Sequence, residues 1–309
     1  MSSHNKKLML TSALRSSTWF GVVAASGLLL GCISDAEDEL PEDVEGGVDI
    51  AEARAEALAA GDPVIVSSST GTAQNGSPGI RVPNGTAAGD LLLLFLHRTD
   101  DGNFWDGPTQ LKGRMSPWRG GWQGPVASCA VFNGPGDAPR DFDCKGREAD
   151  LNQVLYWKKA TTEDLRKDGS QYEKLTVNFP GSHPAWAIMA TVRNAETGSN
   201  PVRAWKGQTK CDKVRGTRFP TVSGNSRDLL LLSQSYDDGK DTGVKLGSFP
   251  ASSGFSRVQI LDNDEAGHLY SRVLTTTGAT PEYEMEGGSG SLNDCKDLAV
   301  SIVIKKAGT

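Results

Sequence analysis

The chain has 309 residues and a formal net charge of −6 at pH 7, with 38 acidic against 32 basic side chains. The charge is uneven, because residues 33–62 hold eleven acids and one arginine, while residues 1–31 hold three basic residues and no acid. Residues 63–309 therefore carry about +1, which argues against the basic patch or stripe of a nucleic-acid-binding protein.

The first 31 residues are typical of a secretory signal. Residues 1–18 are polar and basic, and an apolar run follows from Trp19 to Leu30. This run is shorter than the roughly 20 apolar residues that a membrane-spanning helix needs. A basic start, a short apolar run and small residues at its end predict export and cleavage.

The apolar run ends in Leu29-Leu30-Gly31-Cys32, which resembles the lipobox of bacterial lipoproteins. The resemblance implies that the Cys32 sulfur receives a diacylglycerol, that cleavage precedes Cys32, and that acyl chains anchor the protein to a membrane. Ile33 follows the cysteine where an aspartate would favour inner-membrane retention, so outer-membrane sorting is implied and the leaflet stays open. The alternative is an ordinary signal peptide with a chance cysteine.

Residues 32–62 are predicted to form the lipidated cysteine and a flexible acidic tether. So many like charges repel one another, and the segment has too little apolar surface to fold. A short helix over residues 51–60 is compatible with their Ala, Glu, Arg and Leu content. Such a tether would hold the rest of the chain away from an acidic membrane surface.

Four further cysteines agree with an exported protein: Cys129, Cys144, Cys211 and Cys295. In an oxidising compartment they predict two disulfides, for which three connectivities exist. We favour Cys129–Cys144 and Cys211–Cys295, because the first pair brackets a Gly/Pro/Asp loop at residues 133–137 that suits a stapled hairpin. A zinc site is the competing interpretation, although the chain has no Cys-x-x-Cys spacing and no histidine close in sequence to these cysteines.

The pattern of residues 63–309 predicts β-structure nearly throughout. Apolar residues alternate over residues 175–179, 186–192 and 298–304, so each segment can cover a core with one face. Only Thr161–Lys167 looks like a helical turn. Many short strands between Gly and Pro clusters predict one all-β domain, a jelly-roll-like antiparallel β-sandwich.

An internal repeat suggests that this sandwich has two similar halves. Asp90 precedes four leucines and Asp228 precedes four more, 138 residues further on, and an Asp-Asp-Gly sequence follows each run. Four consecutive leucines indicate a strand buried on both faces. The second interval is one residue shorter, which a β-bulge would explain. We expect each half to lend strands to both sheets; two separate domains are the alternative.

Several segments resemble a β-sandwich module of bacterial surface and phage tail-associated proteins. They are Gly89–Leu94, Tyr156–Ala160 and Trp186–Ile188, which match a Gly-Asp-Leu-Leu strand, a Tyr-Tyr-Lys-x-Ala strand and a following strand of that module. The resemblance implies jelly-roll-like sheets over most of residues 64–305. It implies no catalytic residues, and the cysteines depart from its pattern.

Residues 99–123 are the best candidate for a ligand surface. Trp105, Trp118 and Trp122 lie there among glycines, together with Asp101 and Asn103. Flat aromatic rings beside polar side chains suit a saccharide, and loops often carry function. The alternative is that the rings close the end of the sandwich.

The sequence evidence for a calcium site and for catalysis is weaker than that for a ligand surface. Residues 237–241 and 262–265 are rich in the oxygen ligands that calcium prefers, but acid-rich turns between strands are common without a metal. The histidines of the exported part, His97, His183 and His268, are isolated in sequence, and no catalytic motif surrounds them. No catalytic residue is therefore assigned.

The sequence thus predicts a membrane-anchored surface lipoprotein whose sandwich binds a glycan or a protein partner in adhesion or envelope architecture. A polysaccharide-active enzyme is one alternative, and a lipoprotein effector or toxin passed between cells is another. A converging pair of acids in a groove would favour the enzyme.

Overall fold

A computed structural model describes Ala55, Leu58 and residues 61–73, 78–99, 121–133, 139–143, 151–168, 170–172, 174–177, 185–208, 217–237, 247–262, 265–286 and 297–308. All of them belong to one compact unit, Glu45–Thr309. The signal segment, Cys32 and most of the tether lie outside the described residues. Within the predicted tether helix, Ala55 and Leu58 are helical.

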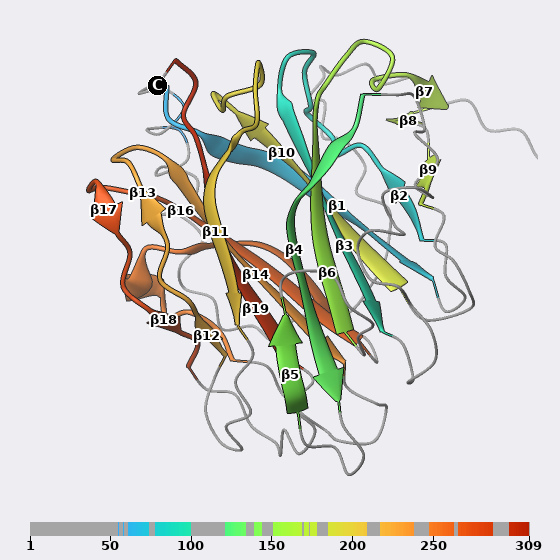
Figure 1. Cartoon of the computed structure of the whole chain (residues 1–309). Helices are drawn as coiled ribbons and strands as arrows, with labels where there is room; N and C mark the ends of the chain where they lie inside the picture. The colour runs from blue at the N-terminus through green and yellow to red at the C-terminus, as the bar shows by residue number, and fades with distance from the viewer. Residues whose placement is uncertain are drawn as a thin grey trace, which may run out of the picture. The chain divides into compact units, whose positions relative to one another are not determined.

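The described structure is all-β, with two large antiparallel sheets (Figure 1). The strand order of the first sheet is β1-β10-β3-β6-β4-β5. Its strands are β1 (Val64–Ala73), β3 (Leu91–Thr99), β4 (Gln123–Asn133), β5 (Pro139–Asp143), β6 (Leu151–Lys159) and β10 (Ala185–Arg193).

The second sheet has the order β11-β19-β14-β16-β15. Its strands are β11 (Val202–Gln208), β14 (Leu229–Asp237), β15 (Ser256–Asp262), β16 (Glu265–Val273) and β19 (Asp297–Ile304). Short two-stranded pairs accompany the sheets: β2 (Gly79–Arg81) with β9 (Lys174–Thr176), β7 (Lys167–Asp168) with β8 (Gln171–Tyr172), β12 (Arg218–Phe219) with β18 (Tyr283–Glu284), and β13 (Ser223–Gly224) with β17 (Gly278–Ala279). A short 3-10 helix, η1 (Ala251–Ser253), precedes β15.

The two halves of the chain repeat one topology. The order β1-β10-β3-β6-β4 of the first sheet corresponds, strand for strand, to β11-β19-β14-β16-β15 of the second, and β2–β9 corresponds to β12–β18. The expectation that each half lends strands to both sheets is therefore wrong, because each half builds one whole large sheet. Strands of one half are closer along the chain, so pairing them closes shorter loops than pairing across the halves would.

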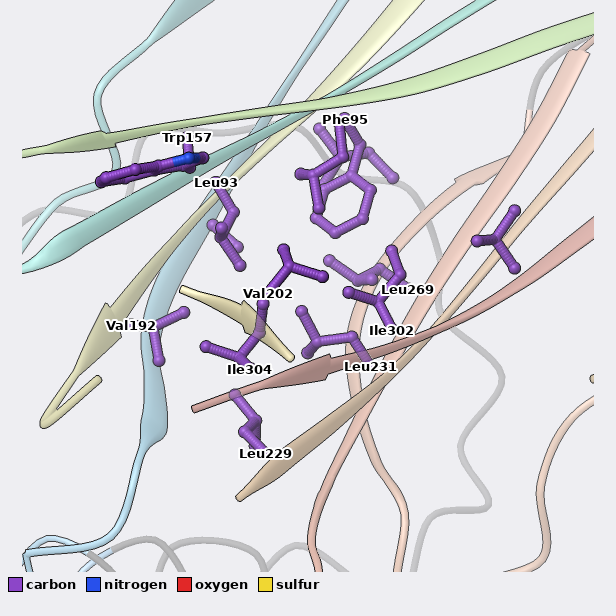
Figure 2. Close-up of a cluster of buried hydrophobic side chains, with 14 of the residues drawn as sticks. Leu93, Phe95, Trp157, Val192, Val202, Leu229, Leu231, Leu269, Ile302 and Ile304 are labelled. Atoms are coloured by element: carbon purple, nitrogen blue, oxygen red, sulfur yellow. The ribbon is translucent and has the colours of Figure 1, made fainter. Parts of the chain in front are cut away.

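The large sheets pack face to face over a central core (Figure 2). The first sheet contributes Leu93, Phe95 and Trp157, and the second contributes Leu231 and Ile302 among others. Alternate residues of β10 and β19 point into this core, as their period-two patterns predicted. Its apolar side chains are almost entirely withdrawn from water, which makes it a main source of stability.

Each large sheet also buries its outer face. Leu92, Leu94 and Leu96 of β3 pack with Ile80 of β2 in a first outer core, while Leu230 and Leu232 of β14 pack with Phe219 of β12 in a second. The leucine runs are therefore buried on both faces, as predicted for strands in the middle of a sheet.

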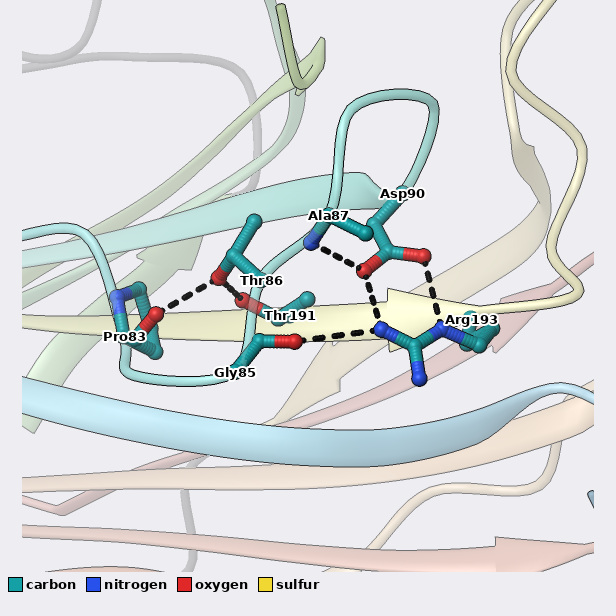
Figure 3. A network of polar contacts seen from close by, with 7 residues as sticks. All are labelled: Pro83, Gly85, Thr86, Ala87, Asp90, Thr191 and Arg193. Atoms are coloured by element: carbon teal, nitrogen blue, oxygen red, sulfur yellow. Dashed lines mark hydrogen bonds and ion pairs between the residues drawn. The ribbon is translucent and has the colours of Figure 1, made fainter. Parts of the chain in front are cut away.

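Buried aspartates fix the start of both leucine strands. The Asp90 carboxylate accepts hydrogen bonds from the Ala87 amide at 2.8 Å and from the Arg193 guanidinium, where Nε lies at 3.0 Å and Nη2 at 2.8 Å (Figure 3). Asp228 repeats this turn, accepting from the amide of Asn225 at 2.8 Å and from Arg203 Nε at 2.5 Å. The Gly-Asp part of the module-like pattern is thus structural here.

The Lys-x-Ala part of that pattern is also structural. Ala160 exchanges backbone hydrogen bonds with Gly89 and Asp90, at 2.8 Å each. Lys158 is buried and paired with Asp164, whose carboxylate also accepts from the Thr161 amide. Gly89 has a φ of 99°, a left-handed conformation that glycine adopts without strain.

Two local expectations concern the leucine strands and Thr161–Lys167. The β3 and β14 registers run without a shift, so the expected bulge is not found along their described pairs, which end at Thr99 and Asp237. Register shifts occur instead in β1, β4, β11 and β15. Thr161–Lys167 contains a helical turn, as expected, in the form of successive i to i+3 hydrogen bonds, and the Asp164 carboxylate accepts a hydrogen bond from the Thr161 amide. No helix among the described residues is long and apolar enough to cross a membrane.

Candidate functional site

The chain enters the sandwich at a well-defined point, which we call the entry end. The Asp62 carboxylate lies 2.5 Å from Arg227 Nε and 3.2 Å from Lys306 Nζ. The Asn194 side-chain amide donates to the Asp62 carbonyl at 3.1 Å. Groups from both halves therefore hold the residue at which the predicted tether joins the first strand.

The opposite end, which we call the loop end, is where β3 and β14 finish. Thr99 of β3 lies opposite Leu151 of β6, and Asp237 of β14 lies opposite Glu265 of β16. Nine-residue strands separate the two ends by roughly 27 Å at about 3.3 Å per residue. The segments that hold most of the predicted ligand and metal residues leave from this end.

The predicted ligand residues Asp101, Asn103, Trp105 and Trp118 lie outside the described residues, and Trp122 lies within them. Trp122 is half-buried and packs against the first outer core. Its neighbour Gln123 pairs with Trp157, six residues along β6 from the Leu151 that faces Thr99. That is roughly 20 Å at 3.3 Å per residue, so the segment begins at the loop end and finishes well away from it.

The predicted calcium segments are brought to the same sheet end. Asp237 pairs with Glu265, and Asp262 pairs with Ala266 in the neighbouring strand pair. The rest of both segments lies largely outside the described residues. Within the described part of the chain, no group of three or more His, Cys, Asp or Glu side chains is arranged to hold a metal ion.

Of the disulfide cysteines, the structure describes only the backbone of Cys129, in β4. Cys144, Cys211 and Cys295 lie outside the described residues, as does His183. Both predicted pairs stay predictions.

A polar cluster lies in the central core near the loop end. His97 Nδ1 is hydrogen-bonded to Ser235 Oγ, Ser235 Oγ donates to Gln153 Oε1 at 3.0 Å, and Gln153 Nε2 donates to Ser233 Oγ at 2.5 Å. The His97 ring stacks on Trp186, with centroids 5.3 Å apart and planes 4° apart. This inner polar cluster joins the two sheets through side chains.

The inner polar cluster contains a serine beside a histidine, which invites comparison with a nucleophile and its base. His97, Ser233 and Ser235 are fully buried, and burial lowers the pKa of His97 to about 3. Its other ring nitrogen, Nε2, is buried and has no hydrogen-bond partner among the residues that the structure describes. A nucleophile needs its base oriented by a third group and an approach for substrate; here the described contacts tie the two sheets together instead.

The sequence analysis treated His97 as isolated in sequence and missed the inner polar cluster. The cluster draws on four strands, so no local motif reveals it. One signal was available: His97 and Ser235 are 138 residues apart, the same offset as the leucine runs.

No family model matches the chain, and no curated protein or solved structure is significantly similar to it.

Proposed function

We propose that the protein is a lipoprotein, anchored to the outer membrane through Cys32, whose loop end binds a glycan or a protein partner outside the membrane. The observation that carries the proposal is the placement of the two ends. Asp62, where the predicted tether joins the sandwich, is held at the entry end, and the segment with the predicted ligand residues starts at the loop end.

The predicted tether would allow the loop end to reach away from the membrane. Residues 33–62 span at most about 100 Å when fully extended, at about 3.4 Å per residue. Their negative charge disfavours contact with an acidic membrane surface. A domain attached at its entry end therefore presents its loop end to whatever lies beyond the membrane.

The predicted ligand residues suit a saccharide. Trp105 and Trp118 offer flat faces for the CH groups of a sugar ring, and Asp101 and Asn103 offer partners for its hydroxyls. Aromatic side chains in binding sites supply large contact area at low entropic cost, because they have few rotatable bonds.

Two measurements test the proposal. Cys32→Ala should abolish metabolic labelling with palmitate and move the protein out of the membrane fraction; membrane retention after a salt wash would refute the anchor. The mature lipoprotein, solubilised in detergent, should bind defined members of a glycan array or one envelope protein. Failure to bind either class would refute the binding role.

A further inference from the structure

The repeated topology provides an internal comparison of the outer faces of the two large sheets. Leu96 of β3 pairs with Ala187 and Val154, and Gln234 of β14 occupies the corresponding place between Ala299 and His268. One step along, Leu94 pairs with Met189 and Tyr156, and Leu232 pairs with Ser301 and Tyr270. Each position of these two rows in the first half therefore has a counterpart in the second half.

The chemistry of these rows differs between the halves. In the first half the corresponding side chains are Leu96, Val154 and Met189, each at most 1% exposed and part of the first outer core. In the second half they are Gln234, His268 and Ser301, at 1%, 4% and 0% exposed. The other three positions keep their residue type: Ala187 and Ala299, Leu94 and Leu232, Tyr156 and Tyr270. Three apolar positions of the first half are therefore polar in the second half.

Among the described residues, the second half leaves four buried atoms of these rows without hydrogen-bond partners: Gln234 Oε1, His268 Nδ1, Tyr270 Oη and Ser301 Oγ. Tyr156 Oη, the counterpart of Tyr270 Oη in the first half, is unpaired in the same way. The other end of the Gln234 amide is satisfied, since its Nε2 is hydrogen-bonded to Thr217 Oγ1. Buried polar groups in native proteins are nearly always paired, and an unpaired one costs folding free energy.

The apolar half shows that the fold does not require polar side chains here. Because the tyrosine cost occurs in both halves, the added cost falls on Gln234, His268 and Ser301, on β14, β16 and β19, and is best explained by a partner that satisfies these polar atoms. We infer that this polar patch, formed by Gln234, His268, Tyr270 and Ser301, binds a small uncharged molecule rich in hydroxyl groups, such as a single sugar residue or a polyol.

The patch chemistry selects this class of ligand. The amide oxygen accepts hydrogen bonds, and the two hydroxyls both donate and accept. Burial lowers the pKa of His268 to about 4, so the imidazole is neutral at physiological pH and offers no charge to an anion. Arg257, which also lowers the His268 pKa, is itself exposed. Hydroxyl groups, which act as both donors and acceptors, match such a set.

The second outer core supplies an apolar neighbour to the patch. Tyr270 belongs to this core, and its ring meets the Phe249 ring edge-on, with centroids 5.0 Å apart. Phe255 and Tyr283 continue the aromatic cluster. Sugar rings combine apolar CH faces with hydroxyls, so a polar row bordering aromatic rings suits them. This inference does not depend on the proposed surface binding.

The test uses the mature lipoprotein in detergent with glucose, galactose, N-acetylglucosamine and glycerol as probes. Saturation-transfer NMR should detect binding of at least one probe at about 10 mM, well above a millimolar dissociation constant. Tyr270→Phe should weaken that binding about tenfold, the loss of one well-formed hydrogen bond. Tyr156→Phe makes the same chemical change at the corresponding position of the first half and should leave binding unchanged.

A second variant separates binding from folding. Gln234→Leu with His268→Val copies the first half, so the protein should melt at the same or a higher temperature and lose the sugar signal. If no probe binds, if both tyrosine variants behave alike, or if the double variant binds as tightly as the parent, the proposal is wrong. A crystal structure grown with the probes that shows only water against the four atoms would also overturn it.

Discussion

His97 Nδ1 and Ser235 Oγ are hydrogen-bonded across the central core, although the two residues occupy corresponding positions in the two halves of the chain. His97 faces Trp186 and Gln153 in the first sheet, and Ser235 faces Leu298 and Gly267 in the second. A residue that contacts its own counterpart lies close to the axis relating two repeats. The hydrogen bond therefore ties the halves together near their local symmetry axis.

Acid should weaken this protein through its buried histidines. Burial lowers the pKa of His97 to about 3 and that of His268 to about 4, against an ordinary value of 6.5. Between these values the unfolded chain binds protons that the folded chain does not. The free energy of unfolding should thus be fully retained above about pH 6.5 and fall below it, by up to about 1.4 kcal/mol per pH unit for each histidine.

Urea unfolding at about pH 7 and about pH 5 measures this dependence. His97→Asn keeps a polar side chain without a titrating ring, so it should reduce the slope with pH while costing stability at neutral pH. An unfolding free energy that is equal at both pH values would contradict the prediction, because it would mean that both histidines titrate normally in the folded protein.

Much of the fold could be predicted from the sequence because burial leaves a readable pattern. Alternation over residues 186–192 and 298–304 located β10 and β19, and each leucine run identified a central strand. The pairing of the strands was harder to predict, because periodicity shows which face of a strand is buried but not which strand lies beside it. The inner polar cluster and the polar patch were missed because their members come from different strands and become neighbours only through register.

Trp186 packs closely against Gly267, so a larger residue at position 267 should destabilise the folded protein. A Cβ on Gly267 would lie 2.7 Å from Trp186 Nε1, inside normal contact distance. Gly267→Ala should therefore cost about 1–3 kcal/mol of stability by overpacking. The exposed Gly198→Ala, which meets only the end of the Glu196 side chain, should cost far less. In a Trp186→Leu background the Gly267→Ala cost should shrink; a purely additive double mutant would argue against direct contact.

Two disulfides, Cys129–Cys144 and Cys211–Cys295, should form in the exported protein. In the β4–β5 register Ala130 pairs with Asp143, so Cys129 immediately precedes one partner and Cys144 immediately follows the other. In the β11–β19 register Gln208 pairs with Ala299, and Cys211 and Cys295 lie a few residues beyond the same strand ends.

Peptide mapping without reductant decides the pairing, and a reductant should lower the melting temperature. The chain-entropy estimate is about 3 kcal/mol for the shorter loop and roughly 4–5 kcal/mol for the longer one. Four free thiols, another connectivity or a bound metal would contradict the prediction.

Trp118 and Trp122 should respond differently to truncation, although they stand close together in sequence. Trp122 is half-buried against the first outer core, so Trp122→Ala should cost about 2 kcal/mol, part of the 3–5 kcal/mol typical of a fully buried ring. If the predicted saccharide surface exists, Trp118→Ala should instead weaken glycan binding about tenfold and leave the melting temperature unchanged. Both variants need thermal melts and array binding in parallel, because loss of fold also abolishes binding. Early unfolding of Trp118→Ala would show that the ring closes the sandwich, and parental affinity in a folded Trp118→Ala protein would locate the glycan surface elsewhere.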